Sequence, residues 1–450
     1  MASRLETKNN VKVQRVFISG ATPYADNRGI AALIRGTLEF LKSTHRQKTI
    51  VYVWHTFPGS YERYYLEKAT TKYTFKDSGI DIYIKVIPVA EPYKHLMTYV
   101  KHVVDLYRLI LATLLFRFLN IIHIEIEPRI PVLRELFTAD IVIELNFGDI
   151  FTDVLYGSIE WFFSVLRFIL FKISGKNIYV LSQSLGPFKS ITSRAITLFL
   201  LRDVKVLGVR EPLSYLYAVR LGIDKNKIRL MPDMGFLTPV VSTKYALNIL
   251  RKEGLSRKNN GPLIGIFLNT HLFSYIISKK HKRIRFLYEL INMIEYLTEK
   301  LNATVILIPH YTLLHKGFDC RAFNILVKNI LKTKNNVIVI TGEYTVEELW
   351  GVLKTLDIVI SFMTHPVIGS LRVGVPVIAV AYTHKTWGIM KMFGLEQYVI
   401  HYGEFNSNIL VKNVADILKR KKYIKEYIEK RKANIYKLFH KLREDIFGQK

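Results

Sequence analysis

The sequence predicts an α/β protein with two doubly wound, Rossmann-like domains and a long C-terminal helix. Short runs of β-branched residues alternate with helical stretches. This alternation stops once near the middle of the chain and then resumes, and the chain ends in a basic helical pattern. A chain of 450 residues is too long for one ordinary domain, and half of its residues are apolar. Each domain can therefore bury a substantial core.

The first domain is expected over residues 11–237. Its predicted strands are 13–18, 50–53, 82–86, 141–145, 178–181, 206–209 and 228–231. Its predicted helices are 29–41, 93–119, 159–173, 192–201 and 213–221. Repeated strand-then-helix order indicates a parallel sheet covered by helices on both faces. The helix at 93–119 is unusually long for such a unit, so a break into two helices stays open.

Residues 238–261 lose this alternation and end in a polar run, which indicates a link between domains. The second domain is expected over residues 262–403. Its predicted strands are 264–268, 305–308, 337–340, 358–361 and 377–380, and its predicted helices are 284–300, 322–331, 346–356 and 367–373. Two such domains predict a GT-B-like architecture, with a site beyond the carboxyl ends of the strands.

Residues 404–450 form a basic amphipathic helical segment, with apolar positions that include Ile424, Ile428 and Ile435. Its apolar face is expected to pack on its own protein, and contact with an anionic membrane is the alternative. Two other apolar stretches, 103–122 and 161–173, are interrupted by charges. We interpret them as buried helices rather than membrane spans.

The net charge of +28 favours anionic partners, but we find no recognised nucleic-acid motif and expect no nucleic acid. The N-terminus lacks a signal-peptide core, and Cys320 is the single cysteine. We therefore expect a cytoplasmic protein, with a place at the inner membrane face left open. Cys320 is interpreted as an inert core thiol.

The loops after the first-half strands contain the first candidate site residues. Asn27 and Gly29 open a helix after the first strand, where a helix N-terminus favours an anion, although Asn also caps helices and Gly also fills turns. Asp149 and Asp153 follow a buried strand. Carboxylates there can transfer protons or position hydroxyl groups, or they can simply cap the next helix.

Gln183 and Arg210 follow the next two strands. Gln183 offers hydrogen bonds to a ligand. Arg210 beside a helix start suits a carboxylate or phosphate, and an ion pair with Glu211 is the alternative. In the second half, His365 and Lys385 stand at successive strand ends, and a histidine there can act as general acid or base. No group of residues has metal-ligand spacing, so we expect no metal and no cofactor.

Taken together, these loops resemble the polysaccharide pyruvyl transferase family. The resemblance runs in order from about Val16 to Leu395. The similar segments are NRGIAALIRG, ADIVIELNFGDIFTDVLYG, QSLGPF, VREPLS with a later PD, IPH, and His365 followed by GVPVIAVAYTHK. Each segment alone is weak, and their ordered combination is fairly specific.

The resemblance implies a GT-B-like fold and transfer of a pyruvyl group from phosphoenolpyruvate to a sugar of a cell-surface polysaccharide or lipid-linked glycan. It suggests His365 and Asp149 as catalytic residues. Donor binding would fall to Arg210, Lys385, Asn27 and Gly29, and acceptor binding to Asp153 and Gln183.

The sequence departs from the family pattern at two positions. Ile30 stands where the family commonly has Asp, and Met363 stands where it usually has Arg. Another basic residue, such as Arg372 or His384, could replace that arginine; otherwise the donor differs or activity is lost. A glycosyltransferase that uses a nucleotide sugar and a non-catalytic glycan-binding relative therefore stay open as alternatives.

Overall fold

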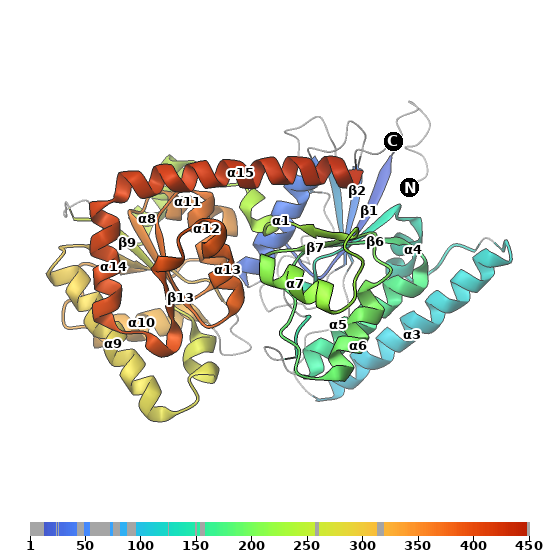
Figure 1. Ribbon diagram of the computed structural model, residues 1–450, viewed down its shortest axis with the longest axis horizontal. Helices are drawn as coiled ribbons and strands as arrows, with labels where there is room; N and C mark the ends of the chain where they lie inside the picture. Colours follow the sequence, from blue (N-terminus) through green and yellow to red (C-terminus); the bar gives the residue numbers. More distant parts are fainter. Residues whose placement is uncertain are drawn as a thin grey trace. The chain divides into compact units, whose positions relative to one another are not determined.

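The computed structural model describes most of the chain. The described residues are 13–23, 25, 27–42, 49–54, 73–74, 82–87, 96–124, 126–148, 151–153, 158–256, 261–312 and 319–447. They fall into two compact units (Figure 1). Unit 1 comprises Met1–Ala25, Thr37–Met231 and Lys441–Lys450, and unit 2 comprises Asp26–Gly36 and Pro232–His440.

Unit 1 contains an eight-stranded sheet in the order β3-β4-β2-β1-β5-β6-β7-β8 among the described residues. The strands are β1 (Gln14–Ser19), β2 (Thr49–Trp54), β3 (Tyr73–Thr74), β4 (Ile82–Ile87), β5 (Ile141–Glu144), β6 (Asn177–Gln183), β7 (Val206–Val209) and β8 (Ile228–Leu230). All pair in parallel except β3, which is antiparallel to β4. The short strand β3 is an addition to the predicted sheet.

Helices cover this sheet. They are α1 (Arg28–Lys42), α3 (Leu96–Ile121), α4 (Pro131–Thr138), α5 (Ser158–Ser174), α6 (Ile191–Leu201) and α7 (Pro212–Arg220). The core beneath them includes a cluster of aromatic rings in which Phe171 lies edge-on to both Phe17 and Trp54, with centroids 5.8 Å apart in each pair. The burial of these large rings helps to hold helix α5 on the sheet.

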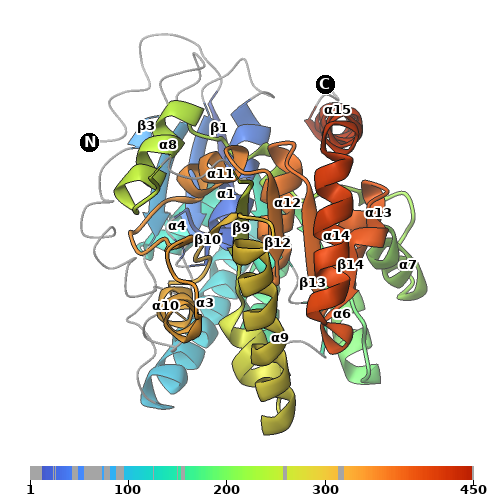
Figure 2. The ribbon, with the colours of Figure 1, turned by 90° about the vertical axis from the view of Figure 1, so that its left-hand side faces the viewer.

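Unit 2 contains a parallel six-stranded sheet in the order β11-β10-β9-β12-β13-β14. The strands are β9 (Leu263–Phe267), β10 (Thr304–Leu307), β11 (Val337–Val339), β12 (Ile358–Ser361), β13 (Val377–Ala381) and β14 (Val399–His401). The helices are α8 (Thr243–Lys252), α9 (Lys280–Glu299), α10 (Cys320–Ile330), α11 (Val346–Lys354), α12 (Thr364–Arg372), α13 (His384–Met392), α14 (Ser407–Lys419) and α15 (Lys421–Phe447). Figure 2 shows α9 and α14 side by side, where Ser407 hydrogen-bonds to Glu289.

Helix α8 occupies the segment in which we expected only a link between domains. The Ser242 side chain accepts a hydrogen bond from the Tyr245 N–H and caps the helix, and Ala246, Ile249 and Leu250 are buried. The phenol of Tyr245 donates to Glu348 of α11 over 2.8 Å. The pattern was missed because this ten-residue helix has only a narrow apolar stripe.

The expected domain boundaries differ from the compact units. Residues 26–36, at the start of α1, and residues 232–237 belong to unit 2, and the end of the chain from Lys441 belongs to unit 1. The segment 404–450 forms α14 and α15, whose apolar residues Ile424, Ile428 and Ile435 are buried. The expected apolar face of the C-terminal helix therefore packs against the rest of the protein.

Helix α3 corrects another expectation. We interpreted residues 103–122 as a buried helix, yet one side of this unbroken 26-residue helix carries exposed apolar side chains, including Leu111 and Phe118. Its other side packs on α5, and Figure 1 shows the two helices adjacent. Among the described helices, none is long and apolar enough to cross a membrane. Sequence hydrophobicity alone does not show which apolar face is covered.

Candidate active site

Each sheet has a point where the strand order reverses, and ligands in such sheets bind beyond the strand ends at that point. In unit 1 the reversal lies between β1 and β5, and in unit 2 it lies between β9 and β12. The sequence-predicted site residues fall near both points.

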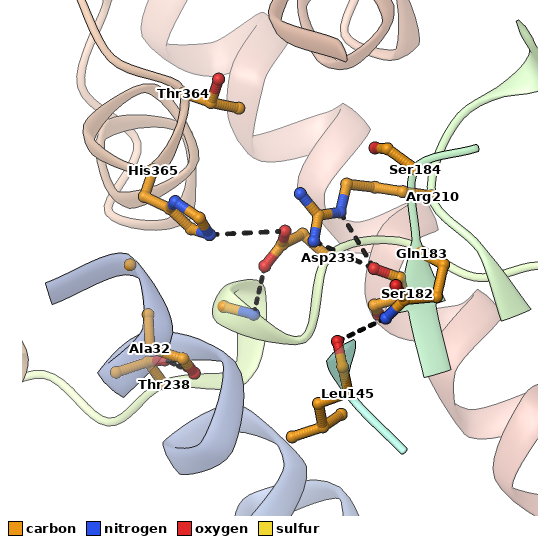
Figure 3. Close-up of polar contacts among 12 residues, drawn as sticks. Ala32, Leu145, Ser182, Gln183, Ser184, Arg210, Asp233, Thr238, Thr364 and His365 are labelled. Carbon is orange, nitrogen blue, oxygen red and sulfur yellow. Dashed lines mark hydrogen bonds and ion pairs between the residues drawn. The ribbon is translucent and has the colours of Figure 1, made fainter. Parts of the chain in front are cut away.

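In unit 2, His365 lies in the first turn of α12, directly after β12. The Ser361 hydroxyl bonds to both the carbonyl and the N–H of Met363, which shapes the turn between strand and helix. The His365 side chain is 15% exposed, and its Nε2 lies 3.9 Å from the fully buried carboxylate of Asp233 (Figure 3). When the imidazole carries a proton, the two groups form an ion pair, and the protonated ring is the form that can donate a proton.

Asp233 is held in place by the backbone, since its Oδ1 accepts a hydrogen bond from the Gly235 N–H over 2.7 Å. The start of α1 approaches His365 from another side. A methyl group added at Gly29 would collide with the imidazole ring, so glycine permits this approach. The Asn27 side chain accepts a hydrogen bond from the Gly29 N–H over 2.9 Å. Asn27 therefore caps the helix. The sequence analysis gave this capping role as the alternative to anion binding.

His310 and Arg28 complete this group, and the sequence analysis did not predict either as a site residue. The rings of His310 and His365 are stacked, with centroids 6.1 Å apart. Burial lowers the pKa of His310 well below its usual value, and the neighbouring His365 and Arg28 lower it further. His310 is therefore neutral at physiological pH. The segment IPH contains His310, and NRG contains Arg28, so both stood inside the quoted motifs.

Lys385 lies in the first turn of α13, after the neighbouring strand β13. Burial lowers its pKa to about 8, so the amine is still mostly charged at neutral pH. The hydroxyls of Thr364 and Thr386 hydrogen-bond over 2.7 Å and join the first turns of α12 and α13. His365 and Lys385 therefore occupy two adjoining helix N-termini.

These two N-termini differ from most others in unit 2. Helices α8, α10, α11 and α14 each have a first-turn N–H bonded to the side chain of the capping residue. The described caps of α12 and α13, Met363 and Thr383, make no such bond; neither does that of α9. Within the described part of the chain, the buried Thr383 hydroxyl has no hydrogen-bond partner. The N-termini beside His365 and Lys385 thus retain donors for an anion.

The basic residues suggested as replacements at Met363 lie in different places. Arg372 is the last residue of α12, about 10 Å along the helix from His365. Its guanidinium lies over the Tyr436 ring, 5.4 Å from the ring centre. Arg372 is therefore not beside His365. His384 directly precedes Lys385 at the start of α13. The structure adds Arg28 to these candidates, because it is buried and acts electrostatically on His310.

In unit 1, Arg210 and Gln183 bind backbone carbonyl groups (Figure 3). The Arg210 guanidinium donates to the Ser182 carbonyl over 2.9 and 3.2 Å. The register between β6 and β7 shifts at this point, and Ser182 has a left-handed φ of 53°, so Arg210 satisfies a carbonyl that the ladder leaves out. The Gln183 amide donates to the Leu145 and Leu181 carbonyls. Both contacts stabilise the strand ends.

Asp153 accepts hydrogen bonds from the Lys189 and Ser190 N–H groups at 2.7–3.1 Å. Burial raises the pKa of Asp153, but these hydrogen bonds outweigh it, and the net pKa lies below the ordinary value. The carboxylate therefore anchors the loop before α6. Asp149, the other expected carboxylate, lies outside the described residues.

A buried polar network that sequence reasoning missed lies at the reversal point of unit 1. Arg167 of α5 forms an ion pair with Glu144 at 3.2 Å, with side-chain exposures of 2% and 0%. Arg167 also donates to the Asn146 side-chain oxygen over 2.8 Å, as does the Ser164 hydroxyl over 2.7 Å. No sequence spacing pairs these residues, because Arg167 is brought in by helix packing. Elsewhere, burial raises the pKa of Cys320, which agrees with an inert thiol.

Comparison with known sequences agrees with the resemblance of the loops. The family model described as "Polysaccharide pyruvyl transferase" matches residues 27–384, which is most of the chain. The amylovoran biosynthesis protein AmsJ of Erwinia amylovora is 23% identical over 322 residues, covering 68% of this chain and 72% of that protein.

Solved structures share the fold. A putative UDP-N-acetylglucosamine 2-epimerase from Listeria monocytogenes is 12% identical, with a TM-score of 0.58 and 98% of both chains covered. The UDP-GlcNAc 2-epimerase from Neisseria meningitidis is 13% identical, with a TM-score of 0.53 and coverage of 95% of this chain and 100% of that one. At these identities the likeness establishes a GT-B-like fold and carries no argument about activity.

Proposed function

Because the chain belongs to the polysaccharide pyruvyl transferase family and is a transferase, we propose that it moves a pyruvyl group from phosphoenolpyruvate to a sugar during polysaccharide synthesis. The observation that carries this proposal is the pair of adjoining helix starts near the reversal point of unit 2, which hold His365 and Lys385 and have no side-chain cap. The similarity to an amylovoran biosynthesis protein supports a glycan acceptor. The proposal includes no metal or cofactor. A lipid-linked acceptor and a cytoplasmic location stay predictions.

The reaction joins one phosphoenolpyruvate to two hydroxyl groups of a sugar. An acid gives a proton to the methylene carbon of the donor, which leaves positive charge on the enol carbon. A sugar hydroxyl bonds to that carbon and loses its proton to a base. The bond from this carbon to the phosphate oxygen breaks, and the second hydroxyl closes the ketal while its proton leaves with the phosphate. The site must therefore supply a proton and hold two anionic groups.

His365 is the proposed acid. When charged, its ring forms an ion pair with the buried Asp233 carboxylate 3.9 Å away, and the charged ring is the form that this step needs. After the proton has moved to the donor, the neutral imidazole can accept the proton that the sugar hydroxyl loses. His310 is the proposed positioning residue, since its neutral ring stacks on His365 and restricts the orientation of that ring.

Lys385 and the first turns of α12 and α13 are proposed to bind the donor's phosphate or carboxylate. A buried lysine charged at neutral pH, beside uncapped helix N-termini, binds an anion more strongly than a solvated lysine does. Arg28 supplies positive charge that acts on His310. We propose that Arg28 takes over the electrostatic role of the family arginine that Met363 replaces.

The remaining predicted roles have weaker support. Gly29 acts through its lack of a side chain, and Asn27 acts as a helix cap. Arg210, Gln183 and Asp153 bind backbone groups, so any contact with donor or acceptor would be additional to these bonds. Their roles, and that of Asp149, stay predictions.

Calorimetric titration with phosphoenolpyruvate tests the proposal directly. The wild-type protein should show saturable binding, and His365→Ala should weaken it about tenfold, the loss typical of one charge-assisted contact. His281→Ala is the matched control, because His281 is exposed on α9. Its affinity should equal that of the wild type.

A panel of nucleotide sugars in the same titration separates the alternatives. Clear binding of a nucleotide sugar without binding of phosphoenolpyruvate would contradict the proposal and favour a glycosyltransferase. Binding of neither donor, in protein whose unfolding transition is intact, would also contradict it and favour a non-catalytic relative.

A further inference from the structure

Helix α3 carries an unusual surface for a protein of this fold class. The face of α3 that points away from α5, and the segment that follows α3, expose large apolar side chains. We call the helical part the α3 stripe. Its members are Val100, Val104, Tyr107, Leu111, Leu114, Leu115, Phe118 and Ile121, with exposures of 41–65%. In the segment after the helix, Ile122, Ile124, Ile126 and Ile130 are exposed by 39–52%. Single exposed apolar residues are ordinary, but a contiguous band of this size marks an interaction surface.

The stripe is a continuous face of the helix. At about 3.6 residues per turn, its positions repeat every three or four residues and share one side. The opposite side holds the buried Leu106 and Thr113 and packs towards α5. Both faces of helix α3 are therefore apolar, and only the face that packs on α5 is covered. Nothing in the described part of unit 1 covers the other.

Charges on the flanks of the stripe restrict what could cover it. Arg108, 75% exposed, lies on one flank, and Arg117, exposed on the other, donates one N–H to the Ile173 carbonyl at the end of α5 over 3.0 Å. Asp105 is the only acidic residue in the helix, and it already lies 3.6 Å from Arg108. Pairing of two copies of this helix along the stripe would bring arginine flanks together with little acidic charge to offset them. The complementary partner is apolar in its middle and anionic at its rim.

An anionic lipid bilayer has this chemistry. A helix that lies in the plane of the membrane buries its apolar face at the boundary between headgroups and acyl chains, while flanking arginines reach the phosphates. The aromatic residues Tyr107 and Phe118 are suited to that boundary. Helix α3 does not meet the requirement for a span, which agrees with a position along the surface. The chain's net charge of +28 adds long-range attraction to the same partner.

We propose that the α3 stripe docks unit 1 onto an anionic membrane surface. This inference does not depend on the proposed transfer reaction. It also differs from membrane contact through the C-terminal helix, because the apolar residues Ile424 and Ile428 of α15 are buried in the protein. The insertion of side chains is assigned to α3, and α15 can contribute charge only.

Co-sedimentation of the full chain with lipid vesicles tests the proposal. One vesicle preparation contains phosphatidylcholine alone, and the other contains phosphatidylcholine mixed with phosphatidylglycerol. We expect the wild type to bind the anionic vesicles, and to bind less as salt is raised. The variant Leu111→Gln/Phe118→Gln/Ile121→Gln should lower the partition coefficient about tenfold or more.

A matched variant separates this surface from exposed apolar residues in general. Ile191→Gln/Ile284→Gln/Tyr288→Gln changes three side chains on α6 and α9 that are exposed by 60–81%. It should bind vesicles as the wild type does. Since all the altered side chains are exposed, both variants should keep the wild-type unfolding transition, which shows that neither has lost its fold.

Three outcomes would overturn the proposal. One is no binding of the wild type to anionic vesicles. Another is equal binding by the α3 variant and the wild type. The third is a wild-type dimer that the α3 variant converts to a monomer without any vesicle binding, since the stripe would then be an interface between copies.

Discussion

The two sheets place polar residues at equivalent reversal points, but the two groups differ in how their charges are used. In unit 1, the buried guanidinium of Arg167 meets the Glu144 carboxylate, and Arg210 binds a backbone carbonyl. In unit 2, His365 and Lys385 lie in the first turns of two helices joined by the Thr364–Thr386 hydrogen bond. Arg28 acts electrostatically on His310, and the carboxylate beside His365 is that of Asp233, 3.9 Å away. Charges that are matched within the protein stabilise the fold. A surplus of one sign is instead suited to a ligand of the other sign.

The helix starts also differ. In unit 1, Ser190 caps α6, and the two helices whose described caps make no side-chain bond, α4 and α7, each begin with a proline, which has no N–H to satisfy. In unit 2, the capping residues of α12 and α13 make no side-chain bond, and neither helix begins with a proline. An uncapped helix start costs stability, so two adjoining ones beside a buried lysine are better explained by a ligand than by folding. The comparison therefore predicts that substitutions in unit 1 change stability, and that substitutions in unit 2 change ligand affinity.

The largest expected effect is on stability in unit 1. Arg167→Met leaves the buried Glu144 carboxylate without its cation and should lower the free energy of unfolding by about 3–5 kcal/mol in urea titration. The double variant Glu144→Leu/Arg167→Met should recover much of the loss, because no charge then stays buried. Folded protein of either variant should bind phosphoenolpyruvate with wild-type affinity. Weaker binding by the folded double variant would remove the contrast between the units.

The next effect combines stability with binding at Gly29. A methyl group there collides with the His365 ring, so Gly29→Ala should cost about 1–3 kcal/mol of unfolding free energy. By displacing the ring, it should also weaken phosphoenolpyruvate binding. Gly29→Ala/His365→Ala provides the control, because removal of the ring relieves the collision. The two changes should therefore be non-additive in stability, and additive costs would show that Gly29 does not act through His365.

The sequence predicted the fold well for a physical reason. Parallel strands buried on both faces are continuous β-branched runs, such as Ile358–Ser361, and can be recognised without tertiary information. The prediction missed α8, whose apolar stripe is narrow, and the short elements β3, α4, α13 and β14. It also misjudged α3, because a sequence shows that a helix is apolar but not which of its faces other elements cover.

The site was harder to predict than the fold. His365 and Lys385 could be identified because both follow a strand directly, where the chain topology brings them to one edge of the sheet. Arg28 and His310 were in quoted motifs but were not selected, since their proximity to His365 depends on how the start of α1 packs in unit 2. Arg210 and Gln183 were selected for their chemistry, and their bonds to backbone carbonyls depend on a local register shift.

A smaller effect is expected in the pH dependence of donor binding. Burial lowers the pKa of Lys385 to about 8, so the amine is charged below that pH and loses its proton above it. Phosphoenolpyruvate should bind about tenfold more weakly at about pH 9 than at about pH 7. Lys385→Arg keeps its charge and should lose this dependence, while Lys385→Met should bind weakly at both values. Equal wild-type affinity at the two values would exclude Lys385 from the donor site.

The smallest effect is expected at His310. Burial, together with His365 and Arg28, holds its pKa well below 6.5, so the folded protein keeps it neutral while the unfolded chain takes up a proton. Stability should therefore fall as pH drops below 6.5, by about 1 kcal/mol per pH unit from this residue. His310→Phe should flatten that slope in urea titrations between about pH 7 and about pH 5, whereas the exposed His281→Phe should not. If the His310 variant keeps the full slope, the His310 ring is protonated in the folded state. The positive charge of unit 2 would then have to be balanced by carboxylates, as Glu144 balances Arg167 in unit 1.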